Sequence, residues 1–314
     1  MTELPAGLRS VALIGRTNVG KSTLFNALAD EKLSIVTRKP HTTRIPVAAS
    51  VGTPGGPIWF WDTPGASVRP THPMQRRLNE SVWQSVEEAD ALLFVVEALH
   101  WLPADLSVLE QAERSGKPVG GVVTKIDRIK AKTALLPFLT RLTEHADVLF
   151  WVPVSATRRE NLSRLIVCVD QHFKVATVHP DRSHGHRRGL AFPDFAAELF
   201  RERLMERLSG ELPYALHVLC SRWIDEVDRM EIDLRVLVER PGQRRIVVGT
   251  GGEVLRQAGS EVRVQLEAQT GKRIMLRSWV EIDPGWSTRG PDAVIRSDEG
   301  NGKMPPASLP VEHD

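Results

Sequence analysis

The sequence predicts an α/β fold, with a mostly parallel sheet and helices on both of its faces, followed by a smaller α+β unit. In the first half, five short apolar runs alternate with helical patterns, at residues 11–14, 58–61, 91–96, 119–123 and 148–154. Strands that alternate with helices favour a parallel sheet. Near residue 177 the composition becomes polar and basic, and new apolar runs begin at Phe195. We therefore expect domains over 1–176 and 195–288, joined by a linker over 177–194.

The composition is that of an ordinary globular protein. The chain has 314 residues, of which 41% are hydrophobic and 25% are charged. The net charge of +2 neither requires nor excludes a nucleic-acid partner. Cys168 and Cys220 lie far apart in apolar contexts and are expected to be buried free thiols of a reducing compartment. No apolar run is long enough to span a membrane, and the first strand begins too near Met1 for a leader. These features predict a cytoplasmic protein.

The first apolar run leads into residues 15–22, which read GRTNVGKS, and then into a helical pattern. A glycine-rich loop between a strand and a helix is the context of a phosphate-binding P-loop. Gly15 and Gly20 allow backbone N–H groups to turn toward phosphate oxygens. Lys21 supplies a charge for the outer phosphates, Ser22 can hold Mg²⁺, and the helix N-terminus adds a partial positive charge. The loop alone predicts a nucleoside triphosphate of any base.

Two further segments fit the terminal phosphate and its metal ion. Asp62, in the sequence DTPG directly after the strand at 58–61, can hold the Mg²⁺ shell, and the Gly65 N–H can reach the terminal phosphate. The loop at 39–44 reads KPHTTR. A threonine there, Thr43 or alternatively Thr42, can coordinate Mg²⁺ when the terminal phosphate is present. This makes residues 32–47 a predicted switch segment.

The sequence TKID at residues 124–127 follows the strand at 119–123 and bears on the identity of the base. The Asp127 carboxylate can accept hydrogen bonds from N1–H and the exocyclic amine of guanine, whereas adenine presents an acceptor at N1. Such a site can reject the wrong base by ~10⁴-fold. The Lys125 stem can cover the base, and the backbone at Ser155 and Ala156 can donate to the guanine carbonyl. These five motifs, in one order and with four of them at predicted strand ends, together predict a guanine-nucleotide site.

The second half predicts a compact α+β unit. An amphipathic helix begins at Phe195, and strand-like runs follow at 214–220, 232–238 and 274–282. Between the last two runs lies RRIVVGTGGEVLRQ, in which we expect the GTGG loop to separate a strand from a helix. The tail at 289–314 is rich in Gly, Pro and acidic residues without periodicity and is expected to be disordered.

The quoted motifs resemble those of one family. GRTNVGKSTLFNAL, RKPHTTR, DTPG and TKID are similar to the nucleotide motifs of the Era family of translation-factor-class GTPases. RERLMERLSGELPYALHV, LRVLVERPGQRRIVVG and SWVEIDPGW resemble the type II KH domain of that family. The resemblance covers residues 8–288. It implies a P-loop GTPase domain followed by a KH domain, a GTP/GDP cycle with Mg²⁺, and binding of small-subunit ribosomal RNA near its 3′ end during late assembly of the small ribosomal subunit.

Carried over residue by residue, the resemblance also implies the site residues. Those expected to bind nucleotide are Gly15, Asn18, Val19, Gly20, Lys21, Ser22, Thr23, Asp62, Gly65, Thr124, Lys125, Asp127, Ser155 and Ala156. Hydrolysis is expected to depend on Lys21, Thr43 and Gly65, and Mg²⁺ is expected on Ser22, Thr43 and Asp62. The RNA-binding GxxG loop is expected at Gly249, Thr250, Gly251 and Gly252.

The sequence departs from the family pattern in four places. Thr17 stands where the family has proline. Thr124 replaces the asparagine of NKxD, which is expected to lose an amide bond to the P-loop and to weaken nucleotide binding. The GxxG loop holds no lysine or arginine and is followed by Glu253, so the nearby residues Arg244, Arg245, Arg256 and Lys272 are expected to supply the positive charge. The spacing before the strand at 58–61 is shortened, with a hairpin turn at residues 55–56.

Ala66 follows DTPG, where many GTPases place the glutamine that orients the attacking water. The Era family shares an apolar residue there, so we expect slow intrinsic hydrolysis, with backbone groups of the switch segments positioning the water. Asn18 is a candidate to hold a monovalent cation in place of an arginine finger.

Two other functions remain open. One is a GTP-dependent switch on a protein or membrane partner with a degenerate KH domain, which the uncharged GxxG loop favours. The other is a nucleotide-binding RNA scaffold with little turnover. We expect a monomer in the cytoplasm, with peripheral association with the inner membrane left open.

Overall fold

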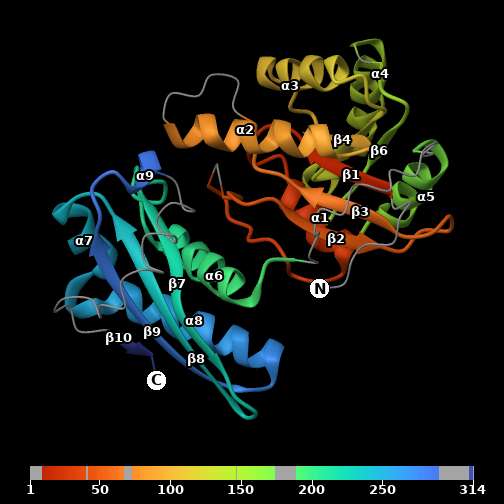
Figure 1. Ribbon diagram of the computed structural model, residues 1–314. Helices are drawn as coiled ribbons and strands as arrows, with labels where there is room; N and C mark the ends of the chain where they lie inside the picture. Colours follow the sequence, from red (N-terminus) through yellow and green to blue (C-terminus); the bar gives the residue numbers. More distant parts are fainter. Residues whose placement is uncertain are drawn as a thin grey trace. The chain divides into compact units, whose positions relative to one another are not determined.

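The structure is a computed structural model that describes residues 9–39, 42–66, 73–145, 147–173, 189–289 and 311–313. It divides into two compact units (Figure 1). The first comprises residues 1–36 and 40–189, and the second comprises residues 37–39 and 190–314. Each unit has its own sheet, and each is described separately.

The first unit is built on a six-stranded sheet in the order β2–β3–β1–β4–β5–β6. Neighbouring strands are parallel except β2, which runs antiparallel to β3 at the edge of the sheet. The strands are β1 (Arg9–Ile14), β2 (Val47–Val51), β3 (Ile58–Asp62), β4 (Ala91–Glu97), β5 (Val119–Thr124) and β6 (Trp151–Pro153). The predicted mostly parallel sheet is confirmed.

Helices cover both faces of this sheet. They are α1 (Lys21–Ala29), α2 (Pro73–Glu88), α3 (Pro103–Arg114), α4 (Leu135–His145) and α5 (Leu162–His172), with single 3₁₀ turns η1 (Ile126–Arg128) and η2 (Lys132–Ala134). Buried side chains of α2, α3 and α4 share one core with Ala12 and Ile14 of β1. Because side chains alternate along a strand, the buried Val11 and Leu13 face the opposite side, and helix α1, which has no residue in the first core, contacts β1 and β3.

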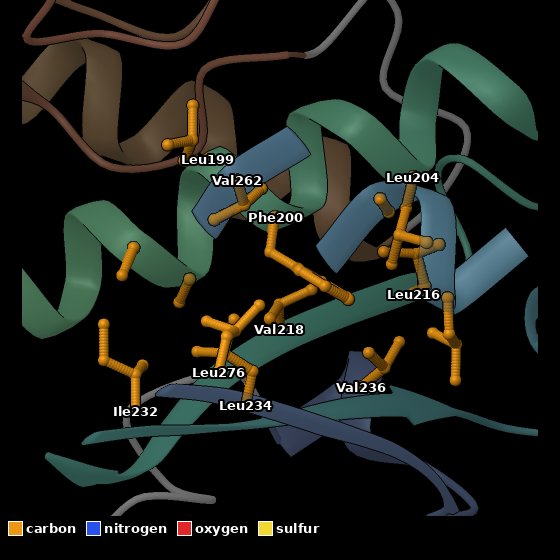
Figure 2. Close-up of a cluster of buried hydrophobic side chains, with 14 of the residues drawn as sticks. Leu199, Phe200, Leu204, Leu216, Val218, Ile232, Leu234, Val236, Val262 and Leu276 are labelled. Carbon is orange, nitrogen blue, oxygen red and sulfur yellow. The ribbon is translucent and has the colours of Figure 1, made fainter. Parts of the chain in front are cut away.

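The second unit is a four-stranded sheet in the order β10–β9–β8–β7. Its elements are α6 (Phe192–Arg207), β7 (Leu216–Asp225), β8 (Arg229–Val238), α7 (Pro241–Val248), η3 (Thr250–Gly252), α8 (Glu253–Thr270), β9 (Arg273–Ile282), α9 (Trp286–Arg289) and β10 (Val311–His313). Figure 2 shows Phe200 of α6 directed toward Val218 of β7 and Leu204 lying beside Leu216, in a buried cluster that also contains Val262 of α8 and Leu234 of β8. One apolar core therefore joins the helices to the sheet.

Strands β8 and β9 are parallel and are connected by α7, the glycine loop and α8. A parallel pair requires such a crossover connection. The expectation that GTGG separates a strand from a helix is wrong, because residues 241–248 form a helix. Pro241 occupies its first turn, and the Gln243 side chain accepts the N–H groups of Glu239 and Arg240 at 2.9 Å. These start signals override the β-branched run of Ile246, Val247 and Val248.

The structure agrees with one further expectation about the fold and changes the bounds or burial of three others. The hairpin turn at 55–56 connects β2 to β3, as predicted. Helix α6 begins at Phe192, inside the predicted linker, whose residues 177–188 lie outside the described residues. In the predicted disordered tail, residues 290–310 also lie outside them, whereas β10 pairs antiparallel with β9. Cys168 and Cys220 are free thiols but half-buried rather than buried.

Candidate functional site

The P-loop runs from the end of β1 to the start of α1 with the backbone conformation that its glycines allow. Gly15 and Gly20 have φ angles of 152° and 104°. A Cβ atom built on Gly15 would lie 2.4 Å from the carbonyl oxygen of Val95, so only glycine fits there. Helix α1 begins at Lys21, so its partially positive N-terminus faces the loop.

Lys21 is buried beneath this loop. Its ammonium donates hydrogen bonds to the carbonyl oxygens of Gly15 and Arg16, each at 2.9 Å. Burial lowers the pKa of Lys21 to about 8, while the nearby Asp62 carboxylate acts in the opposite direction. Phosphate groups bound in the loop would raise the pKa again and keep the side chain charged.

Three oxygen-bearing side chains converge beside Lys21. The hydroxyl oxygens of Ser22 and Thr43 are 2.8 Å apart, and the Thr43 hydroxyl donates to Oδ2 of Asp62 at 3.4 Å. Asp62 is fully buried, and among the described residues its Oδ1 atom has no hydrogen-bond partner. Burial raises the pKa of Asp62 to about 6, opposed by the Ser22 hydroxyl and the Lys21 charge. A buried carboxylate with an unsatisfied oxygen beside two hydroxyls fits Mg²⁺.

This geometry favours Thr43 over the alternative Thr42 as the switch threonine. Both residues are buried, but it is the Thr43 hydroxyl that contacts both Ser22 and Asp62.

The DTPG segment packs directly on the P-loop. The Ala66 N–H donates to the Gly15 carbonyl at 3.1 Å, and Ala66 forms an isolated parallel bridge with Arg16. A Cβ atom built on Gly65 would lie 2.5 Å from Cγ2 of Thr17. Only glycine therefore allows this approach, and the apolar Ala66 is held at the loop by its backbone.

The TKID segment is tied to the P-loop by two side chains. The Thr124 hydroxyl donates to the Val19 carbonyl and also lies 3.0 Å from the Val96 carbonyl. The Lys125 ammonium donates to the Asn18 carbonyl at 2.6 Å. The Thr124 hydroxyl therefore makes a link to the P-loop in place of the expected amide bond, and the expected weakening of nucleotide binding stays a prediction.

The predicted base-reading carboxylate is held in place by a neighbouring loop. The Ser155 hydroxyl, just after β6, donates to Oδ1 of Asp127 at 2.6 Å. Asp127 and Lys125 are both half-buried, and the bond from Ser155 engages Oδ1 rather than Oδ2 of Asp127. The fourteen residues predicted to bind nucleotide lie on the first turn of α1, or at the ends of β1, β3, β5 and β6 and in the segments that follow them. They therefore gather at the carboxyl edge of the sheet, where ligands bind in such folds.

The glycine loop of the second unit lies between α7 and α8. Gly249, Gly251 and Gly252 have φ angles of 76°, 60° and 79°. A Cβ atom on Gly249 would lie 2.6 Å from Cγ2 of Val254, whereas one on Gly251 would meet nothing within 4 Å. Gly251 therefore offers open backbone that a ligand can approach closely.

Of the basic residues expected around this loop, three lie close to it. Arg256 donates to the Gly251 carbonyl at 3.1 Å, and Arg244 and Arg245 lie on α7 just before the loop, with Arg245 exposed. Lys272 does not belong to this group. It lies beyond the far end of α8, where its ammonium bonds the Asp225 carboxylate at 2.5 Å.

Comparison with known proteins identifies both units. Residues 10–125 match a family model described as 50S ribosome-binding GTPase, and residues 211–287 match a KH domain model. The chain is 39% identical over 285 residues to GTPase Era of Stenotrophomonas maltophilia strain K279a, which covers 91% of this chain and 95% of that relative. It is 38% identical to GTPase Era of Xanthomonas axonopodis pv. citri, over 96% of that relative. The chain belongs to the GTPase Era family.

Solved Era structures agree with this assignment. A single-residue variant of Aquifex aeolicus Era bound to GDP and AlF₄⁻ matches with a TM-score of 0.82 and 30% identity, over 92% of this chain and 97% of that one. An Era complex with MgGDPNP and nucleotides 1506–1542 of 16S ribosomal RNA matches equally well. As a member of the Era family the chain is a GTPase, with a P-loop GTPase domain and a KH domain.

Sequence reasoning missed two acidic residues that form ion pairs with residues of the nucleotide motifs. Glu97, at the end of β4, lies 2.6 Å from the Lys125 ammonium. Asp105, in the first turn of α3, lies 3.0 Å from Nε of Arg16. Neither belongs to a recognised motif, and only the fold brings them to the P-loop. No helix of the described residues is long and apolar enough to cross a membrane.

Proposed function

We propose that this protein is a GTP-hydrolysing switch that binds small-subunit ribosomal RNA near its 3′ end and assists assembly of the small ribosomal subunit. One observation carries the proposal: the chain joins a GTPase domain, in which the predicted nucleotide-binding residues gather at one edge of the sheet, to a KH domain with an open glycine loop. Its likeness to an Era structure in complex with a 16S ribosomal RNA fragment extends over both domains.

The nucleotide-binding roles follow from the geometry of the site. Backbone N–H groups from Gly15 to Gly20 and the start of α1 would hold the phosphates, with Lys21 supplying charge. Asp127, oriented by Ser155, would read N1–H and the amine of guanine. The Lys125 stem would cover one face of the base, with Ala156 at its edge.

For hydrolysis, Ser22, Thr43 and Asp62 would hold Mg²⁺, which supplies charge stabilisation to the transferring phosphoryl group. Lys21 would share the developing charge, and the Gly65 N–H would contact the terminal phosphate. Ala66 has no side-chain group to orient water, so backbone groups of the switch segments would position it. We expect slow intrinsic turnover for that reason.

Asn18 is proposed as a site for a monovalent cation beside the phosphates. It is exposed, with a φ angle of 63°, and its carbonyl already bonds Lys125. Potassium in place of sodium is expected to raise turnover, and equal rates in the two salts would exclude this role.

RNA binding would use the loop at 249–252, with Arg245 and Arg256 contacting the phosphates beside it. We place the protein in the cytoplasm as a monomer, with peripheral association with the inner membrane as the alternative. The direct test is binding of a labelled RNA of the small-subunit 3′ end to the GTP-loaded protein. If that RNA does not bind while GTP hydrolysis is intact, a switch on a protein or membrane partner would be favoured. The lack of lysine and arginine within the GxxG loop is the observation that supports this alternative.

A further inference from the structure

An ion pair connects the P-loop to helix α3. Nε of Arg16 lies 3.0 Å from both carboxylate oxygens of Asp105. The Asp105 side chain is fully buried, and that of Arg16 is 18% exposed. Arg16 is the second residue of the P-loop, and Asp105 lies in the first turn of α3, so the pair spans 89 positions of sequence.

The carboxylate is fixed at its own end. Oδ2 of Asp105 accepts the backbone N–H of Leu102 at 2.9 Å, which anchors the side chain to the start of α3. Burial raises the pKa of Asp105, and this N–H and the Arg16 charge oppose that effect. Removing one partner of a buried pair leaves an uncompensated polar group. The pair therefore holds Arg16 at one position relative to α3.

The backbone of Arg16 is in turn connected to two parts of the hydrolytic site. Its carbonyl accepts the Lys21 ammonium at 2.9 Å, and its main chain bridges to Ala66. The adjacent Gly15 carbonyl accepts both Lys21 and the Ala66 N–H. Any shift of Arg16 would therefore move Lys21 and the segment that follows DTPG together.

We infer that Asp105, acting through Arg16, is a positioning residue for GTP hydrolysis in this protein. It holds the P-loop backbone against which Lys21 and the segment at Gly65 and Ala66 are placed. This role is important here because the Ala66 side chain has no polar group to orient the attacking water. The water must then be oriented by backbone groups, whose positions depend on the P-loop. Displacements of about 1 Å in a reacting geometry can cost ~10²-fold in rate. Asp105 itself is not expected to touch the nucleotide.

The alternative is that the pair only stabilises the fold. A positioning residue and a stabilising residue differ in kinetics. Loss of positioning lowers kcat with little change in KM, whereas loss of stability alone lowers the unfolding temperature and leaves the folded enzyme at full rate.

The test is a double-mutant cycle of Asp105→Asn and Arg16→Gln in the full chain. The amide oxygen introduced by Asp105→Asn can still accept the Leu102 N–H, so this change removes the charge and keeps the helix cap. The matched control is Asp90→Asn. The Asp90 carboxylate also accepts a backbone N–H, that of Ser10 at 2.9 Å, but Ser10 lies near the start of β1, at the opposite end of the strand from the P-loop. Basal kcat and KM for GTP and the unfolding temperature are measured for each protein.

We expect Asp105→Asn and Arg16→Gln each to lower kcat by about tenfold, with KM changed by less than about threefold. The double variant should be no slower than either single variant, because both changes break the same link. Asp90→Asn should keep the wild-type kcat. If Asp105→Asn does not fold, Arg16→Gln alone carries the test, since its side chain is partly exposed. Wild-type kcat in Arg16→Gln, losses that multiply in the double variant, or an equal loss in Asp90→Asn would overturn the inference.

Discussion

Single hydroxyl groups hold the nucleotide site together at the residue scale. Four hydroxyl groups each form a hydrogen bond to a group in another segment of the site, and they belong to Ser22, Thr43, Thr124 and Ser155. Such bonds contribute about 1 kcal/mol each to stability, but each also fixes one functional group in place. Replacing a threonine with valine removes the hydroxyl and keeps the volume of the side chain. Such substitutions therefore test the hydrogen bond without opening a cavity.

Thr124→Val is expected to weaken GDP binding by about tenfold, because the Val19 and Val96 carbonyls lose their shared donor. Displacement of a fluorescent GDP analogue measures this. Thr140→Val is the matched control, since the exposed Thr140 hydroxyl bonds a carbonyl one turn earlier on α4, away from the P-loop. Unchanged affinity in Thr124→Val would show that the hydroxyl link has no role in binding.

Asp127→Asn is expected to lower GTP affinity by at least about 100-fold, because the amide N–H that replaces one carboxylate oxygen would face the exocyclic amine of guanine. The same amide can donate to the C2 carbonyl of xanthine, so xanthosine triphosphate should gain affinity. Competition between the two nucleotides measures the change. A variant that still prefers GTP would place base recognition elsewhere.

At the scale of elements, the role of the loop between α7 and α8 can be tested with a substitution at Gly251 that has a matched control at Gly271. Gly251 and Gly271 have φ angles of 60° and 69°, and a Cβ atom on either would meet nothing within 4 Å. Both therefore accept a side chain with the same backbone strain. Gly271 ends α8 at the end opposite to the loop, so it serves as a matched control.

Gly251→Asp is expected to weaken binding of the small-subunit 3′-end RNA by at least about tenfold, because the carboxylate would repel phosphates and block the close approach of the backbone. Gly271→Asp should bind RNA as the wild type does. Filter binding or fluorescence anisotropy at fixed salt measures both. Equal affinities in the two variants would remove this loop from the RNA site.

Four of the five nucleotide motifs follow an apolar strand, and this position together with their fixed residue types allowed them to be located from the sequence. The helix α7 could not, because its Ile246, Val247 and Val248 run resembles a strand and only the cap at Gln243 shows otherwise. The pairing of β10 with β9 joins residues far apart in sequence, and no local pattern predicts it. The ion pair of Asp105 with Arg16 could not be predicted either, because these two residues are also far apart in the sequence and belong to no common motif.

At the scale of the whole molecule, we predict that the nucleotide state controls RNA binding. GTP would order residues 32–47 through Thr43, and we expect this ordering to strengthen RNA binding by the KH domain. RNA should bind more tightly with a nonhydrolysable GTP analogue than with GDP. Thr43→Val should abolish this difference, whereas Thr42→Val should keep it, because it is the Thr43 hydroxyl that contacts Ser22 and Asp62. Equal RNA affinity with both nucleotides in the wild type would contradict the coupling.

The central claim is that one chain joins GTP hydrolysis to recognition of ribosomal RNA. The most direct measurement is steady-state GTP turnover with and without RNA of the small-subunit 3′ end, in the wild type, Gly251→Asp and Gly271→Asp. We predict that the RNA raises kcat in the wild type and in Gly271→Asp, and fails to do so in Gly251→Asp. Turnover that is unchanged by saturating RNA in the wild type would contradict it.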